Sequence, residues 1–202
     1  MNLRRSAAVL LLASAAGFSA AETTAILGAT SILSATAAPQ IQDYLENARE
    51  VKAAGDVQVI ALSIIRLVAN VGHLRTPTEP HPRLLVSDGE IPEPADKAED
   101  PWTAAIDARS TQRLEDHLLD NAAGYPMPTR GGFGWHGPYL DRLTPDPWGS
   151  RYAANVGLLE QPGGKTVIVV SAGPNRIIET PFEQVGLKPA GDDVVALVGR
   201  GQ

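Results

Sequence analysis

The chain has 202 residues, enough for one modest domain with appendages, which excludes a large multidomain enzyme. Its formal net charge is −6 and its pI is near 5.2, with no basic run beyond Arg4-Arg5. Nucleic acid is therefore disfavoured as a partner, because phosphate binding needs clustered Lys and Arg. The chain has no cysteine, which excludes disulfide frameworks, thiolate zinc sites and cysteine nucleophiles.

The N-terminus has two interpretations. Residues 1–16 combine a basic start with an apolar core, a pattern typical of a secretory signal. A signal peptidase that needs small residues before the cut would act after Ala15 or after Ala21, and would release a soluble protein. Alternatively, Gly17 to Pro39 is a weakly apolar segment of membrane-spanning length whose single charge, Glu22, is costly there unless it meets a partner. Either way, export from the cytoplasm is predicted.

A long helix is predicted over residues 18–72. Pro39 is tolerated there as a kink in a packed helix. From Val57 to Val71 the apolar arc widens, so this half should form a spine beneath a globular domain. Gly55-Asp56 is a candidate bend between the two halves, and Gly72 is a plausible C-terminal stop.

Residues 73–101 are rich in proline and acid, and Leu84 to Val86 is their only apolar run, so this segment is predicted to be a linker loop. Its two histidines have no third metal ligand at a supporting spacing, which favours solvated loop residues. A short helix closing near Gly124 follows. On that helix His117 is adjacent to Glu115 and Asp116, a spacing at which the three side chains point to different sides.

Three strands are predicted in the last part of the chain: Ser150 to Leu159, Lys165 to Val170 and Val194 to Val198. An antiparallel sheet of about three strands, packed on the Val57–Val71 helix face, buries both apolar surfaces. The predicted fold is therefore α+β: a long N-terminal helix, a long loop rich in proline and acid, and a small sheet. The domain boundaries follow as a leader at 1–17, the helix at 18–72, the linker at 73–101 and a globular domain at 102–202.

One motif narrows the class of protein. The run GPYLDRLTPDPWGSRY, residues 137–152, resembles the segment in which the major pseudopilins of type II secretion, members of the type IV pilin-like family, carry an Asp-Pro-Trp-Gly motif followed by a tyrosine. The matching residues here are Asp146, Pro147, Trp148, Gly149 and Tyr152. Each also has a local folding role, such as the turn that glycine permits, so we interpret the motif as structural and not as a ligand site.

The N-terminus resembles the same family. If the chain is cut after Gly17, then Phe18 becomes residue one, Glu22 residue five and Pro39 residue twenty-two, the positions at which pilins carry these residue types. The resemblance implies processing by a prepilin peptidase at Gly17-Phe18 and a transmembrane helix in the inner membrane. It further implies that Glu22 pairs with the terminal amine of a neighbouring subunit during filament assembly, which removes the desolvation cost of both charges.

The resemblance also implies a calcium site. Many family members bind Ca²⁺ where a Ser-x-Gly-x-Asp-Gly loop closes on paired acids. Here the corresponding residues are Ser171, Asn175, Asp192 and Asp193, with asparagine where the family has aspartate. Hard oxygen ligands from both ends of a loop suit Ca²⁺, although adjacent aspartates are also common at ordinary turns.

The expected function is that of a structural subunit of a pseudopilus-like filament in type II secretion, with the domain in the periplasm. Its implied partners are itself, other pseudopilins and the inner-membrane assembly platform. The alternative is a soluble periplasmic binding or accessory domain that is exported by an ordinary signal peptide and does not assemble into filaments. An enzyme is not expected, because the sequence has no Gly-x-Ser-x-Gly elbow, His-Glu-x-x-His helix or phosphate loop.

Overall fold

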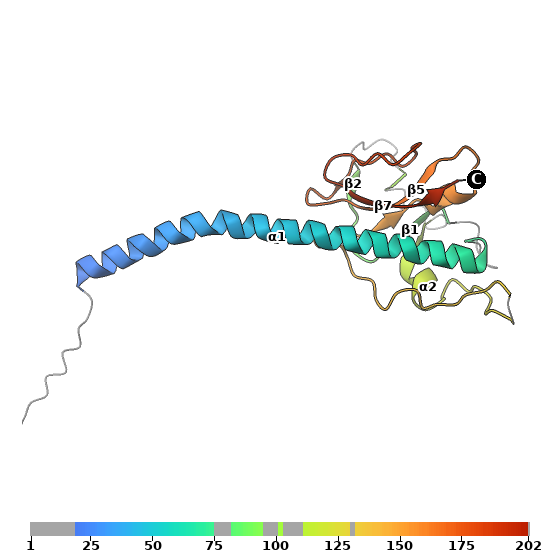
Figure 1. The fold of residues 1–202 in the computed structure, drawn as a ribbon, viewed down its shortest axis with the longest axis horizontal. Helices are drawn as coiled ribbons and strands as arrows, with labels where there is room; N and C mark the ends of the chain where they lie inside the picture. Colours follow the sequence, from blue (N-terminus) through green and yellow to red (C-terminus); the bar gives the residue numbers. More distant parts are fainter. Residues whose placement is uncertain (1–18, 75–81, 95–100, 103–110, 130–131, 202) are drawn as a thin grey trace, which may run out of the picture. The chain divides into compact units, whose positions relative to one another are not determined.

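A computed structural model describes residues 19–74, 82–94, 101–102, 111–129 and 132–201. These residues form a long N-terminal helix and a mixed sheet, an α+β arrangement (Figure 1). The chain divides into two compact units, residues 1–45 and residues 46–202, and the account below concerns the second unit unless stated otherwise.

Helix α1 (Ala20–Val71) is continuous through both Pro39 and the expected bend at Gly55. In the second unit, apolar residues recur three and four positions apart along α1. Residues at this spacing lie on the same side of a helix, so they form one apolar face, which we call the inward face. As predicted, the helix ends before Gly72, whose N–H donates to the Val68 carbonyl at 2.8 Å. The inward face consists of Ala53, Val57, Ile60, Ile64 and Leu67, all nearly inaccessible to solvent.

Five strands form the main sheet, in the order β3-β1-β4-β5-β7. The predicted antiparallel pairing of the last strands is confirmed: β5 pairs with both β4 and β7. Strand β1 is antiparallel to β4 and parallel to β3. The expected antiparallel sheet of about three strands is therefore wrong in two respects, because β1 and β3 extend it to five strands and make it mixed. The strands are β1 (Leu84–Val86), β3 (Thr111–Arg113), β4 (Ala153–Ala154), β5 (Thr166–Ser171) and β7 (Val194–Arg200); β2 (Glu93–Pro94) and β6 (Ile177–Ile178) form a separate parallel pair.

Three predicted elements need correction. The segment 73–101 is not all loop, because its apolar run forms the buried strand β1 and Glu93–Pro94 forms β2. The strand expected over residues 150–159 is only two residues long, and the chain then enters a 3₁₀ helix, η1 (Val156–Glu160). The short helix α2 (Leu114–Leu118) directly follows β3 and ends at Leu118, six residues before the predicted stop at Gly124.

The inward face of α1 and the sheet share one apolar core. Figure 1 shows strands β1, β5 and β7 alongside the C-terminal half of α1. Trp102 and Tyr152 are among the largest fully buried side chains, and Trp102 donates through Nε1 to the Thr180 carbonyl at 2.7 Å. Burial of this surface supplies the main driving force for packing the helix on the sheet.

In the part of the chain that the structure describes, one helical stretch, Pro39–Val71, is long and apolar enough to cross a membrane by length and composition. A third of its most apolar window is buried inside the protein. Those buried residues belong to the hydrophobic core of the 46–202 unit. The apolar side chains of this stretch therefore also pack the helix on the globular unit.

Candidate functional site

The predicted processing residues, Gly17 and Phe18, lie outside the described residues. Glu22 lies in the first turn of α1. Pro39 lies inside the same helix and is exposed. The remaining predicted site residues fall into two neighbouring segments of the second unit, the Asp146–Tyr152 motif and the 171–193 loop.

Asp146 organises the motif turn. Its Oδ1 accepts the backbone N–H groups of Trp148 at 3.0 Å and Ser150 at 2.7 Å, and its Oδ2 accepts the Ser171 hydroxyl at 2.6 Å. Gly149 closes the turn by donating its N–H to the Asp146 carbonyl, at a φ of 94° that a residue with a side chain rarely adopts. This buried carboxylate therefore has partners on both oxygens, which supports the structural interpretation of the motif.

The two aromatic residues of the motif reach helix α1. The indole Nε1 of Trp148 donates to Glu46 Oε1, and the hydroxyl of Tyr152 donates to Asp56 Oδ2 at 2.9 Å. These acceptors lie ten residues apart on the helix, about 15 Å along its axis. The motif thus holds the spine helix at two points, while Pro147 precedes Trp148 within the turn.

The 171–193 loop is bound to the same motif. The Ser171 hydroxyl donates to Asp146, as described above. Arg176 donates through Nη2 to the Trp148 carbonyl, and its Nη1 pairs with Glu90 Oε2 at 2.7 Å. The loop, the motif turn and α1 therefore form one connected set of polar contacts.

The paired acids close the loop on itself. Asp193 Oδ2 accepts the N–H groups of Glu179 at 2.8 Å and Thr180 at 2.6 Å. Asp192 Oδ2 accepts the N–H of Asn175 at 3.1 Å. Gly173 permits this closure, because a Cβ at that position would lie 2.4 Å from the Asp192 carbonyl oxygen.

One carboxylate oxygen of Asp192 and one of Asp193 accept no hydrogen bond from the described residues. Asp192 Oδ1 and Asp193 Oδ1 are buried and have no hydrogen-bond partner among the described residues. Burial raises the pKa of Asp193 to about 6, because removing a carboxylate from water disfavours its charged form. An unpartnered buried carboxylate oxygen is costly unless a cation or a donor reaches it.

The other two expected calcium ligands are already engaged. The Ser171 hydroxyl is committed to Asp146. The Asn175 side chain accepts the Ile177 N–H at 2.7 Å through Oδ1 and donates to Glu179 Oε2 at 3.3 Å. Within the described residues, no three His, Cys, Asp or Glu side chains form a group placed to hold a metal ion. Of the four expected ligands, only Asp192 and Asp193 keep a carboxylate oxygen without a hydrogen-bond partner among the described residues, and further ligands to a cation would have to be backbone carbonyls or water.

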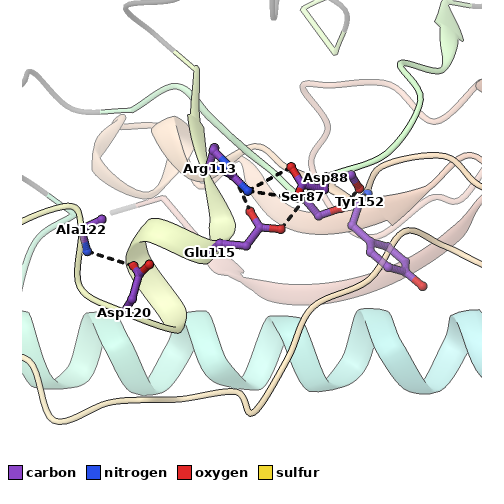
Figure 2. A network of polar contacts seen from close by, with 7 residues as sticks. All are labelled: Ser87, Asp88, Arg113, Glu115, Asp120, Ala122 and Tyr152. Atoms are coloured by element: carbon purple, nitrogen blue, oxygen red, sulfur yellow. Dashed lines mark hydrogen bonds and ion pairs between the residues drawn. The ribbon is translucent and has the colours of Figure 1, made fainter.

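A second polar network lies at the end of β1 and β3 (Figure 2). Arg113 Nη2 lies 3.0 Å from both carboxylate oxygens of Asp88, and Glu115 Oε1 accepts the Asp88 N–H at 3.1 Å. Ser87 Oγ accepts the N–H of Tyr152 at 2.9 Å, which connects this edge to the motif. Arg113 and Asp88 are exposed, so their ion pair contributes little to stability.

His117 has partners other than the residues of this network, namely Gln112 and Tyr125. Its Nε2 lies 2.7 Å from Gln112 Oε1, an acceptor, so Nε2 carries the proton. Its Nδ1 therefore accepts the Tyr125 hydroxyl at 2.7 Å. Burial lowers the pKa of His117 to about 4, so the imidazole is neutral near pH 7 and serves the core.

Glu46, Asp56 and Arg176 were not identified from the sequence as part of the site. On a helix with many charges Glu46 and Asp56 are indistinguishable from solvated side chains. The signal that could have found them is the motif itself, because a buried indole N–H and a buried phenol need polar partners.

Comparisons of the chain with protein-family models, with curated proteins and with solved structures found no match.

Proposed function

We propose that this protein is a pseudopilin-like structural subunit, which assembles through its N-terminal helix into a short filament of a type II secretion system. The observation that supports this most is the double attachment of the family-like motif to helix α1, through Trp148 to Glu46 and through Tyr152 to Asp56. A subunit that transmits its position along a filament needs a domain fixed firmly to its long helix. The α+β arrangement and the Phe18, Glu22 and Pro39 spacing agree with a pilin-like fold.

In this proposal a prepilin peptidase cuts at Gly17-Phe18 and the inner membrane holds the helix before assembly. Glu22 then pairs with the terminal amine of a neighbouring copy on the assembly platform. Intact-mass measurement of the mature protein tests the first step. A chain that starts at N-methylated Phe18 supports the proposal, whereas a start at Ala16 or Glu22 supports a soluble periplasmic protein.

The assembly step is tested with Glu22→Ala in the full chain. We expect loss of sheared filaments with an unchanged thermal unfolding midpoint, because Glu22 lies outside the compact unit of residues 46–202. Glu93→Ala is the control, since Glu93 is an exposed carboxylate in that unit. Normal filament yield with Glu22→Ala would contradict the assembly role.

We also propose that Ca²⁺ binds at Asp192 and Asp193. The support is the pair of buried oxygens, one on each residue, that lack a partner within the described part of the chain. A bound cation would fasten the two ends of the 171–193 loop and would offset the cost of burying both charges.

Thermal unfolding with calcium or with a chelator tests this site. At 100 times the dissociation constant, a ligand that binds only the folded state adds about 2.7 kcal/mol to the free energy of unfolding. The calcium-dependent shift should disappear in Asp193→Asn and persist in Asp88→Asn, a control at an exposed carboxylate. Equal midpoints of the parent protein in calcium and in chelator would contradict calcium binding.

A further inference from the structure

Arg176 has a backbone conformation that is unusual for a residue with a side chain. Its φ is 60°, in the left-handed region, where the backbone crowds a Cβ atom. Such a conformation persists only where the surroundings fix it. The Arg176 N–H donates to the Gly173 carbonyl at 3.2 Å, and the N–H of the preceding residue, Asn175, donates to Asp192 Oδ2 at 3.1 Å. Asp192 thus helps to hold the turn of residues 173–176 in its closed form.

The side chain of Arg176 connects this turn to the Asp146–Tyr152 motif. Its Nη2 donates to the Trp148 carbonyl, and its Nη1 pairs with Glu90 Oε2 at 2.7 Å. Both acceptors lie outside the 171–193 loop. Because the backbone sets the direction of a side chain, a return of Arg176 to the common negative φ would move the guanidinium away from both acceptors. The turn therefore has two arrangements, one with Arg176 on the motif and one without.

Trp148 in turn contacts helix α1. Its indole Nε1 donates to Glu46 Oε1, and Glu46 is the first residue of the 46–202 unit. This hydrogen bond therefore holds the helix at the point where α1 enters the unit. A series of polar contacts connects the paired acids to the helix. Such a series couples two sites when one of its elements has two arrangements that both sites bias, and here that element is the turn of residues 173–176.

We infer that Arg176 couples cation binding at Asp192 and Asp193 to the attachment of helix α1 at Glu46. The inference rests on the proposed calcium site and assigns that site an effect outside its own loop. A cation at Asp192 Oδ1 fixes the carboxylate whose other oxygen holds the Asn175 N–H. The closed turn is then favoured, the guanidinium keeps both acceptors, and the motif stays on the helix. By linkage, firm attachment of the helix favours cation binding in return.

The three tryptophans of the chain report separately on the loop, the motif and the rest of the core. Trp102 donates to the Thr180 carbonyl within the loop and therefore reports on the loop. Trp148 reports on the motif. Trp135 donates to the His117 carbonyl at 3.0 Å, outside both the loop and the motif, and serves as the internal control. Fluorine NMR of the full-length protein in detergent, labelled with 5-fluorotryptophan, measures all three, and single substitutions by phenylalanine assign the resonances.

Addition of calcium to the chelator-treated protein should shift the Trp102 and Trp148 resonances with the same dissociation constant and leave the Trp135 resonance in place. Amide hydrogen exchange over residues 46–52 should slow several-fold in the same titration, because firmer attachment suppresses local opening of this helix segment. A shift of Trp102 alone would overturn the inference and leave the calcium site standing. Absence of any shift would overturn both, whereas the filament role is tested independently with Glu22→Ala.

Arg176→Gly separates the coupling from the fold of the loop. Glycine adopts a φ of 60° without strain, so the turn keeps its backbone hydrogen bonds while the guanidinium is removed. Trp102 should therefore respond to calcium as in the parent, and the response of Trp148 should fall several-fold. Arg200→Ala is the control, because Arg200 is an exposed arginine of β7, outside the loop and the motif, and its Trp148 response should equal that of the parent. A full calcium response of Trp148 in Arg176→Gly would overturn the inference.

Discussion

Asp146 and Asp193 are two buried carboxylates, 4% and 8% exposed. Among the described residues, only Asp146 has hydrogen-bond partners on both of its oxygens. In each, one oxygen accepts two backbone N–H groups. The second oxygen of Asp146 accepts the Ser171 hydroxyl, whereas the second oxygen of Asp193 has no partner among the described residues. The difference separates a group that organises the fold from a group that remains available to bind.

The same difference appears in energetic terms. A carboxylate with partners on both oxygens has exchanged its hydration for protein hydrogen bonds. Asp193 has exchanged only part of it, and burial accordingly raises its pKa to about 6. Stability should therefore depend strongly on Asp146 and weakly on Asp193 when no cation is present.

The largest expected effect is that of Asp146→Ala. The substitution leaves the Ser171 hydroxyl and the Trp148 and Ser150 N–H groups without an acceptor, and each buried unsatisfied donor costs about 1–3 kcal/mol. We expect the free energy of unfolding in chelator to fall by about 4 kcal/mol, measured by urea denaturation. Asp193→Ala should cost only about 1 kcal/mol, because removal of a buried charge offsets two lost hydrogen bonds. Equal losses would contradict the comparison.

His117 extends the comparison to pH. Both ring nitrogens have partners, and burial lowers the pKa to about 4 from an ordinary value of 6.5. Below pH 6.5 the unfolded chain binds a proton that the folded chain does not, so the free energy of unfolding falls as the pH drops from about 6.5 to about 4. The full effect is about 3 kcal/mol, since each pKa unit is worth about 1.4 kcal/mol.

Urea denaturation between about pH 7 and about pH 4.5 measures this contribution. His117→Gln should flatten the fall relative to the parent. His73→Gln is the control, because the His73 side chain is exposed and lies near Glu160 at the surface. If the two variants show the same pH profile, then His117 is not the group responsible.

The elements predicted best from the sequence are those with a long, unambiguous pattern. The β-branched run in β5 and the apolar run in β7 pair as predicted, and the helix stop at Gly72 is confirmed. Proline and acid surround the three apolar residues of strand β1, a composition that predicts a loop, and only the pairing with β4 and β3 makes this segment a strand. Tertiary pairing decided this element against local composition.

The sequence predicts which residue types lie in the candidate site, but it does not predict which of them are in contact. The sequence indicates a turn at Asp146 to Gly149 and a polar loop that ends at Asp192 and Asp193. It does not indicate that the Ser171 hydroxyl belongs to Asp146 rather than to a calcium site, because that contact joins segments 25 residues apart. Which oxygens are left without partners can be known only once the whole loop has folded.

The smallest expected effect tests whether the hydrogen bond from Trp148 to Glu46 helps to fix helix α1 to the motif. Trp148→Phe keeps the aromatic body but removes the N–H that donates to Glu46. A single neutral donor to a partly buried acceptor is worth about 1 kcal/mol. A double-mutant cycle with Glu46→Ala should give a coupling energy of that size, and the same cycle with Glu50→Ala should give none, because Glu50 is an exposed carboxylate one turn further along the helix. Zero coupling between Trp148 and Glu46 would mean that apolar burial alone, and not the polar contact, fixes the helix at this end of the domain.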